Sequence, residues 1–259
     1  MTTVLYNSPI YGPVRSRRLG ISLGINLMPD DGKCCTFDCV YCECGFNATH
    51  IPVHRRPTRQ EVSDSLSGYL LKRHEQHLPL DDISFAGNGE PTSHPQFAQI
   101  VDDTIRLRDK FFPHATVSVM SNATFTGNEE VRLALGRLDN NIQKLDTVDP
   151  DYIRRVDRPA SPHYNVENIV DNLKKFNGNV IIQTLFMKGS ANGKDVDNTG
   201  EFYVKPWLDA LKEIKPRQVM IYTIDRETPD KDLRKAFPIE LDSIRNRVLA
   251  LGISCTVAY

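Results

Sequence analysis

Short apolar runs alternate with amphipathic stretches along most of the chain. Seven apolar runs are rich in β-branched residues and keep little polar alternation in their central part, which is typical of strands buried on both faces. These predicted strands lie at residues 22–28, 82–87, 116–122, 142–146, 179–187, 218–225 and 253–259.

The stretches between these runs have the periodicity and punctuation of helices. They lie at residues 58–77, 96–112, 128–138, 166–176, 201–214 and 240–252. Thr58 is placed to cap the first helix, and Glu61, three residues later, completes a capping box. Pro206 indicates a late start or a kink in the fifth.

Strand–helix units that follow one another predict a parallel sheet with right-handed crossovers, either an open doubly wound sheet or a curved partial barrel. The six units fall short of the eight of a complete barrel, and the last strand is expected to close or edge the sheet. Residues 1–259 contain no fixed-period repeat or long linker, so we expect one domain with its core at about residues 20–229.

Composition excludes several classes of protein. The 259 residues are 40% hydrophobic and 25% charged, which argues against a disordered chain, a collagen-like repeat or a coiled coil. A net charge of -1 provides no global attraction to nucleic acid or anionic lipid. No apolar run reaches the length of about 18 residues that a membrane span needs, and the N-terminus has no signal-peptide pattern, so a cytoplasmic location is expected.

The cysteines are concentrated in one loop. Five of the six lie between residues 34 and 44, and the sixth is Cys255. A disulfide framework would spread its cysteines along the chain, and a reducing compartment would keep them as thiols. Such crowding predicts a metal or cluster site.

Cys35, Cys39 and Cys42 have the spacing C-x3-C-x2-C. Three thiolates on a short loop can hold three corners of a 4Fe–4S cluster and leave one iron open. Two other interpretations remain: a zinc site completed by His50 or His54, and an electron-transfer cluster without its fourth cysteine.

This cysteine spacing, with Phe37 and Tyr41 between the thiols and a strand before them, resembles the radical S-adenosylmethionine (SAM) superfamily. The resemblance implies a partial (β/α)6 TIM-like barrel with parallel strands and a C-terminal edge strand. It also implies two cofactors, a 4Fe–4S cluster and SAM. In that superfamily the open iron binds the methionine part of SAM, and reductive cleavage gives a 5′-deoxyadenosyl radical that abstracts a substrate hydrogen.

A second loop carries a matching signature. The segment SFAGNGEPTSHP resembles the Gly-Gly-Glu-like motif of the superfamily, with Gly89 and Glu90 at its end and Asn88 interrupting the strict form. Glycine permits close backbone approach, and a carboxylate can pair with the ammonium group of SAM.

Further contacts to the cofactor follow from the same resemblance. They are Tyr41 in the cysteine loop, Ser121 and Asn122 after the third predicted strand, and Asp146 after the fourth. Lys144 and Asp146 share one strand face, so Lys144 either lines the site or pairs with Asp146 or Glu90.

Two basic clusters are candidates for phosphate contact, with solvated surface residues as the alternative. The first contains Arg15, Arg17 and Arg18, and the second contains His54, Arg55 and Arg56. Lys33 is expected to be a solvated loop lysine rather than an imine-forming residue.

The segments GPVRSRRLGISLGINLMP, GNGEPTSHP, QKLDTVDPDYIRRVDRP and IYTIDRETP resemble the radical enzymes related to the wyosine-forming tRNA synthase, over about Gly12 to Pro229. The chain departs from that group because only Cys34, Cys44 and Cys255 remain for a second cluster. No flavodoxin-like domain is apparent either, so an external flavodoxin or ferredoxin is expected as the reductant.

The sequence therefore predicts a radical SAM enzyme whose catalytic residues and substrate are unidentified; the substrate is a small molecule, a nucleotide or an RNA. Two alternatives remain open: a wyosine-like enzyme that modifies a tRNA base, and a non-catalytic iron–sulfur electron carrier.

Overall fold

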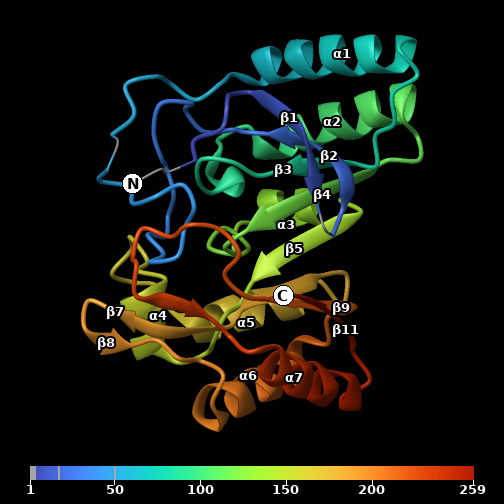
Figure 1. Ribbon diagram of the computed structural model, residues 1–259. Coiled ribbons are helices and arrows are strands. Elements are labelled where there is room, and N and C mark those ends of the chain that lie inside the picture. Colours follow the sequence, from blue (N-terminus) through green and yellow to red (C-terminus); the bar gives the residue numbers. More distant parts are fainter. Residues whose placement is uncertain (1–3, 17, 50) are drawn as a thin grey trace.

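An eight-stranded curled sheet organises the computed structural model, which describes residues 4–16, 18–49 and 51–259 (Figure 1). All neighbouring strands run parallel except the first pair, which is antiparallel. In spatial order the strands are β1 (Ile10–Ser16), β2 (Gly20–Ile25), β3 (Asp82–Phe85), β4 (Thr116–Ser121), β5 (Asn140–Lys144), β6 (Ile181–Leu185), β9 (Gln218–Tyr222) and β11 (Ser254–Ala258).

Helices connect the parallel strands and form an outer layer. They are α1 (Arg59–Glu75), α2 (Phe97–Phe111), α3 (Glu129–Leu135), α4 (Pro150–Val156), α5 (Val166–Lys174), α6 (Glu201–Ile214) and α7 (Pro238–Ala250). The first three pack as neighbours beside the β2–β5 half of the sheet, and α5, α6 and α7 pack beside the other half (Figure 1). The architecture is the predicted half-barrel.

Most predicted elements are confirmed within a few residues. Each of the seven predicted strands matches one of the parallel strands, and β11 pairs only with β9, as a C-terminal edge strand. The Thr58–Glu61 capping box is present at the start of α1. The prediction of a late start at Pro206 is wrong, because α6 already begins at Glu201 and continues through the proline.

Four strands and one helix were not predicted. Strand β1 extends the sheet beyond β2. A separate small sheet contains β7 (Met187–Ala191), β8 (Lys194–Asp195) and β10 (Leu233–Lys235). Helix α4 begins after Asp149, whose side chain accepts a hydrogen bond from the Tyr152 amide, with Pro150 in the first turn. Each of these elements has at most seven residues, and β1 and α4 contain proline, so hydrophobic periodicity does not reveal them.

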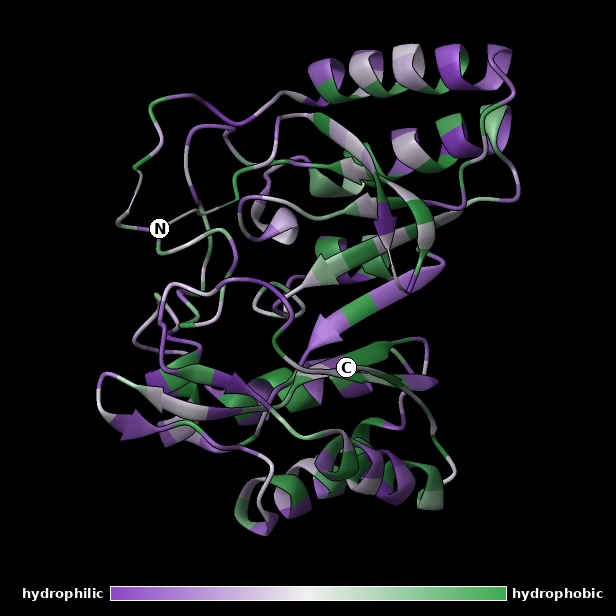
Figure 2. Ribbon diagram, in the orientation of Figure 1, coloured by the Kyte–Doolittle hydropathy of each residue, from purple (hydrophilic) through white to green (hydrophobic). Residues whose placement is uncertain are grey.

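The two faces of the sheet differ in polarity. In β3, Ile83 and Phe85 enter the main hydrophobic core, whereas Asp82 and Ser84 alternate with them onto the other face. Figure 2 shows hydrophobic residues gathered in the strands and on the helix sides that face them. The outer face is thus closed by helices, and the inner face carries polar side chains.

A buried carboxylate organises part of that inner face. Asp82 is fully buried and accepts hydrogen bonds from Ser22 at 2.8 Å and Thr116 at 2.7 Å. Ser84 and Ser118 donate to the same carboxylate. Hydroxyl donors from three strands therefore converge on one acceptor, which compensates for its burial.

No helix described here has both the length and the apolar character needed to cross a membrane.

We expect Asp82→Ala to lower the free energy of unfolding by about 3 kcal/mol, because it leaves several buried hydroxyls without their acceptor. Urea denaturation measures the change. Asp171→Ala is the control, because Asp171 is an exposed residue of α5 and its loss should change stability by less than about 0.5 kcal/mol. Equal effects of the two substitutions would contradict the structural role given to Asp82.

Candidate functional site

The loops that follow β2, β3, β4 and β5 meet at the carboxyl ends of the strands, where parallel sheets place their ligands. The long segment 26–58 follows β2 and lies at this end of the half-barrel (Figure 1). It contains the cysteine cluster, and the segment 86–96 after β3 contains Gly89 and Glu90.

Backbone hydrogen bonds join the cysteine loop to the loop after β3. The Cys34 amide donates to the Asn88 carbonyl at 2.8 Å, and the Glu90 amide donates to the Cys34 carbonyl at 3.4 Å. Gly89 lies between these bonds with φ at +147°, and a Cβ there would lie 1.9 Å from the Cys34 carbonyl oxygen. Only glycine fits this close approach.

The three cysteines of the C-x3-C-x2-C motif are free thiols in the structure. The Phe37 amide donates to the Cys35 sulfur at 3.5 Å, and the Asn122 side-chain amide donates to the same sulfur at 3.6 Å. Burial raises the pKa of Cys35 to about 12 and also raises the pKa of Cys39 well above its usual value. The Cys44 thiol, with Lys33, lowers the pKa of Cys42. A site that binds these cysteines as thiolates must supply positive charge.

Lys33 supplies such charge, and its prediction as a solvated loop lysine is wrong. The side chain is 3% exposed and donates to the Gly45 carbonyl at 2.8 Å. Burial lowers its pKa, but the net pKa is raised because Cys42, Cys39 and Cys35 favour the charged ammonium. Asp38 accepts from the ammonium at 3.4 Å. The lysine is therefore positioned to offset thiolate charge.

The spacing of the thiols differs from that of a closed zinc site. Tetrahedral zinc with Zn–S bonds of about 2.3 Å brings its sulfurs to about 3.8 Å from one another. Among the described residues, three ligand atoms lie within 4.8 Å of one another only at Asp30, Asp31 and His54. At least two of the three motif sulfurs are therefore more than 4.8 Å apart, which is wider than the sulfur spacing of a closed zinc site. His50 lies outside the described residues.

Glu90 is a buried carboxylate held by neutral donors. It accepts from the Asn122 amide at 2.6 Å and from the Thr92 amide at 3.0 Å, and it is 2% exposed. Burial raises its pKa. No lysine, arginine or histidine of the described chain forms an ion pair with it. This carboxylate can therefore receive an ammonium group from a ligand.

Ser121 and Asn122 lie beside Glu90 at the end of β4. Ser121 is buried, and its hydroxyl accepts from the Ala123 amide at 3.0 Å and also contacts Glu90. Asn122 contacts Glu90 through its backbone and Cys35 through its side chain. It links the thiol loop to the carboxylate.

Tyr41 and Asp146 belong to a buried network that reaches Cys39 through Asp157. Lys144 forms ion pairs with Asp146 and, at 2.9 Å, with Asp157. The Tyr41 hydroxyl donates to Asp146, and the Leu185 amide donates to the other oxygen of Asp146 at 2.9 Å. The structure thus places Lys144 in an ion pair with Asp146, one of its two expected partners, and adds Asp157. Sequence reasoning missed Asp157, which follows the unpredicted helix α4.

The two predicted basic clusters are mostly used within the molecule. Arg55 pairs with Glu61 at 2.6 Å, and His54 contacts Asp30 at 2.7 Å. Arg56 donates to the Ser93 carbonyl at 2.7 Å and to the Cys34 sulfur at 3.1 Å. In the first cluster, Arg18 lies over the ring of Tyr222, and Arg17 lies outside the described residues.

Sequence comparison identifies relatives but no matching family model. The chain is 30% identical over 231 residues to a UPF0026 protein of Helicobacter pylori, covering 87% of this chain and 69% of the relative. It is also 30% identical over 235 residues to a UPF0026 protein of Synechocystis, covering 87% of this chain and 78% of the relative.

Structural comparison identifies the fold. A radical SAM methyltransferase from Sphaerobacter thermophilus superposes with a TM-score of 0.66 at 15% identity, covering 92% of this chain and 66% of that one. SuiB from Streptococcus suis, bound to S-adenosylmethionine, superposes with a TM-score of 0.63 at 13% identity, covering 90% and 50%. The chain has the half-barrel fold of radical SAM enzymes and spans half to about two thirds of these structures.

We expect Gly89→Ala to lower the melting temperature by about 4–8 °C, because the Cβ collides with the Cys34 backbone at a position that requires positive φ. Calorimetry measures the shift. Gly68→Ala in α1 is the matched control, since its Cβ would meet nothing within 4 Å and alanine favours a helix. Unchanged stability of the Gly89 variant would show that the junction of the two loops is not rigid.

Proposed function

Since the chain belongs to the UPF0026 family and has the half-barrel fold of radical SAM enzymes, we propose that it is itself a radical SAM enzyme. Its cofactors are a 4Fe–4S cluster and SAM. The observation that carries the proposal is the junction at Gly89, which joins the loop of the three free thiols to the loop of a buried carboxylate with no cationic partner among the described residues.

The donor set fits both cofactors. Cys35, Cys39 and Cys42 would hold three irons of the cluster, and Glu90 would receive the ammonium group of SAM. When bound, the cluster supplies the electron that cleaves SAM to a 5′-deoxyadenosyl radical. Lys33 offsets thiolate charge, and the amides of Phe37 and Asn122 stabilise the Cys35 sulfur.

Other residues have supporting roles in the proposal. Ser121 and Asn122 orient Glu90 and line the space beside it. Tyr41 and Asp146 contact each other and Lys144, and in the proposal this network forms one wall of the cofactor site. Both residues would contact the cofactor from this wall. This wall excludes water from the reacting carbon, as radical chemistry requires.

The reaction needs an electron from outside the described site, and we propose a flavodoxin or ferredoxin as its source. The substrate is a small molecule, nucleotide or RNA. We do not extend the proposal to the wyosine reaction, which uses a second iron–sulfur cluster. Cys34 and Cys44 lie in the same loop as the three proposed cluster ligands, and Cys255 lies in β11. Three cysteines dispersed in this way do not form a second cluster loop.

Cys39→Ser should prevent assembly of the cluster, because serine replaces a thiolate that iron requires. Iron and sulfide content and the visible absorption after anaerobic reconstitution measure the loss. Cys255→Ser is the control, since Cys255 lies in the edge strand β11. If both variants assemble the cluster equally well, the ligand assignment is wrong.

Glu90→Gln should weaken SAM binding by about tenfold or more, because the amide keeps the shape of the side chain but removes the charge that pairs with the ammonium group. Calorimetric titration of the cluster-loaded protein measures the affinity. Glu213→Gln removes an exposed carboxylate on α6 and should leave the affinity unchanged. Equal affinities of wild type and the Glu90 variant would remove Glu90 from the cofactor site.

A further inference from the structure

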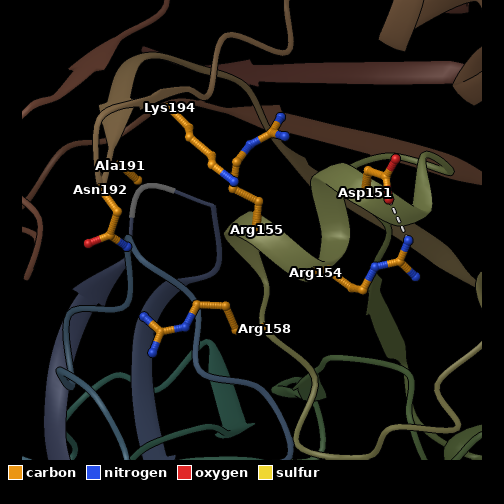
Figure 3. Close-up of a pocket in the computed structure, with 7 residues that line it drawn as sticks. All are labelled: Asp151, Arg154, Arg155, Arg158, Ala191, Asn192 and Lys194. Carbon is orange, nitrogen blue, oxygen red and sulfur yellow. Dashed lines mark hydrogen bonds and ion pairs between the residues drawn. The ribbon is translucent and has the colours of Figure 1, made fainter.

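A cleft of about 680 Å³ opens between α4 and the β7–β8 hairpin (Figure 3). One side of the cleft contains Arg154 and Arg155 of α4 and also Arg158, which lies two residues beyond the end of that helix. The hairpin contributes Asn192 and Lys194. The cleft belongs to elements that hydrophobic periodicity did not predict. Its volume lies within the range of small-molecule sites in proteins.

The charge of the cleft is strongly unbalanced. Four of its lining residues are cationic, and Asp151 is the single carboxylate among them. Asp151 pairs with Arg154 at the exposed edge, and Figure 3 shows Arg154 directed toward Asp151. Arg158 pairs with Asp38, so Arg155 and Lys194 remain as the cationic lining residues that form no ion pair in the described chain. Like charges held together in this way favour an anionic ligand.

Arg155 has unused hydrogen-bonding capacity. Its Nε atom is buried and has no hydrogen-bond partner among the described residues. One terminal nitrogen donates to the Tyr203 hydroxyl at 3.3 Å, and the guanidinium lies 5.4 Å from the centre of the Tyr152 ring. No carboxylate of the described chain pairs with it. A buried donor without an acceptor costs free energy, which a bound oxyanion would recover.

The cleft borders the cysteine loop at Arg158. Arg158 pairs with Asp38 at 3.2 Å and lies over the ring of Phe46, and both partners belong to the cysteine loop. The Asp38 amide donates to the carbonyl of Asp157, whose side chain belongs to the Lys144 network. One lining residue of the cleft therefore contacts the loop that holds the thiols.

We infer that this cleft binds a phosphate group of the substrate. The inference rests on the proposed function in one respect, because it identifies the ligand as the substrate of the enzyme. The binding of phosphate itself does not require the cluster. A phosphate carries more charge than a carboxylate and matches the planar fork of a guanidinium, which suits the Arg155 guanidinium and the Lys194 ammonium. A free phosphorylated metabolite and the backbone of an RNA present the same group.

The test is calorimetric titration of the purified 259-residue chain, before and after cluster loading, with three probes. Ribose 5-phosphate represents a free phosphate ester, a single-stranded uridine oligomer represents RNA, and a glutamate-rich peptide represents a carboxylate ligand. Measuring both protein forms separates this inference from the proposed function, because phosphate binding survives even if no cluster assembles.

The variants are Arg155→Gln and Lys194→Gln, with Lys175→Gln as the control. Lys175 contacts Asn172 at the end of α5, outside the cleft lining, and its loss removes the same charge. Lys194 is exposed on the hairpin, so we expect Lys194→Gln to fold. This variant therefore tests the cleft even if Arg155→Gln fails to fold.

We expect wild type to bind a phosphorylated probe and each cleft variant to raise the Kd at least tenfold, while the control changes it less than twofold. Tighter binding of the oligomer than of ribose 5-phosphate identifies RNA as the source of the phosphate, and the reverse identifies a free metabolite. Absence of phosphate binding, equal binding by all variants or binding of the peptide alone would overturn the inference.

Discussion

The close passage of Cys34 over Gly89 is the constraint on which the rest of the candidate site depends. Two backbone hydrogen bonds join the loops there, and a Cβ at residue 89 would lie 1.9 Å from the Cys34 carbonyl oxygen. Because the junction is made of backbone, it fixes the main chain next to Cys35 relative to that of Glu90, whichever rotamers the side chains adopt. The half-barrel places the two loops at the ends of neighbouring strands, and this junction holds the loops together as one site.

Buried charge is balanced in different ways around this junction. Lys33 faces the thiols, and Lys144 is shared between Asp146 and Asp157. Glu90, by contrast, has only neutral donors, and Arg155 has no carboxylate partner in the described chain. Buried charges are costly without partners. These two groups without an opposite charge are the places where we propose that ligands bind: an ammonium at Glu90 and an oxyanion at Arg155.

The sequence predicted the features that depend on local pattern. Strand and helix order, the Thr58 capping box and the cysteine spacing follow from neighbours in the chain, and most elements lie within a few residues of their predicted places. The burial of Lys33 and the pairing of Lys144 with Asp157 depend on distant segments, so they needed the structure. The Asn192–Gly193 dipeptide was a detectable sequence signal for the β7–β8 hairpin, because Asn-Gly favours tight hairpin turns. In the structure both residues have the positive φ that such turns require.

Reductive cleavage of SAM tests the central claim most directly. The anaerobically reconstituted wild-type protein would be reduced with dithionite in the presence of SAM, and 5′-deoxyadenosine would be quantified by chromatography, with the Cys39→Ser protein as the blank. The account predicts 5′-deoxyadenosine from the wild type and none above background from the variant. A cluster-loaded wild type that binds SAM, accepts an electron and forms no 5′-deoxyadenosine with any phosphorylated probe present would contradict the assignment as a radical SAM enzyme.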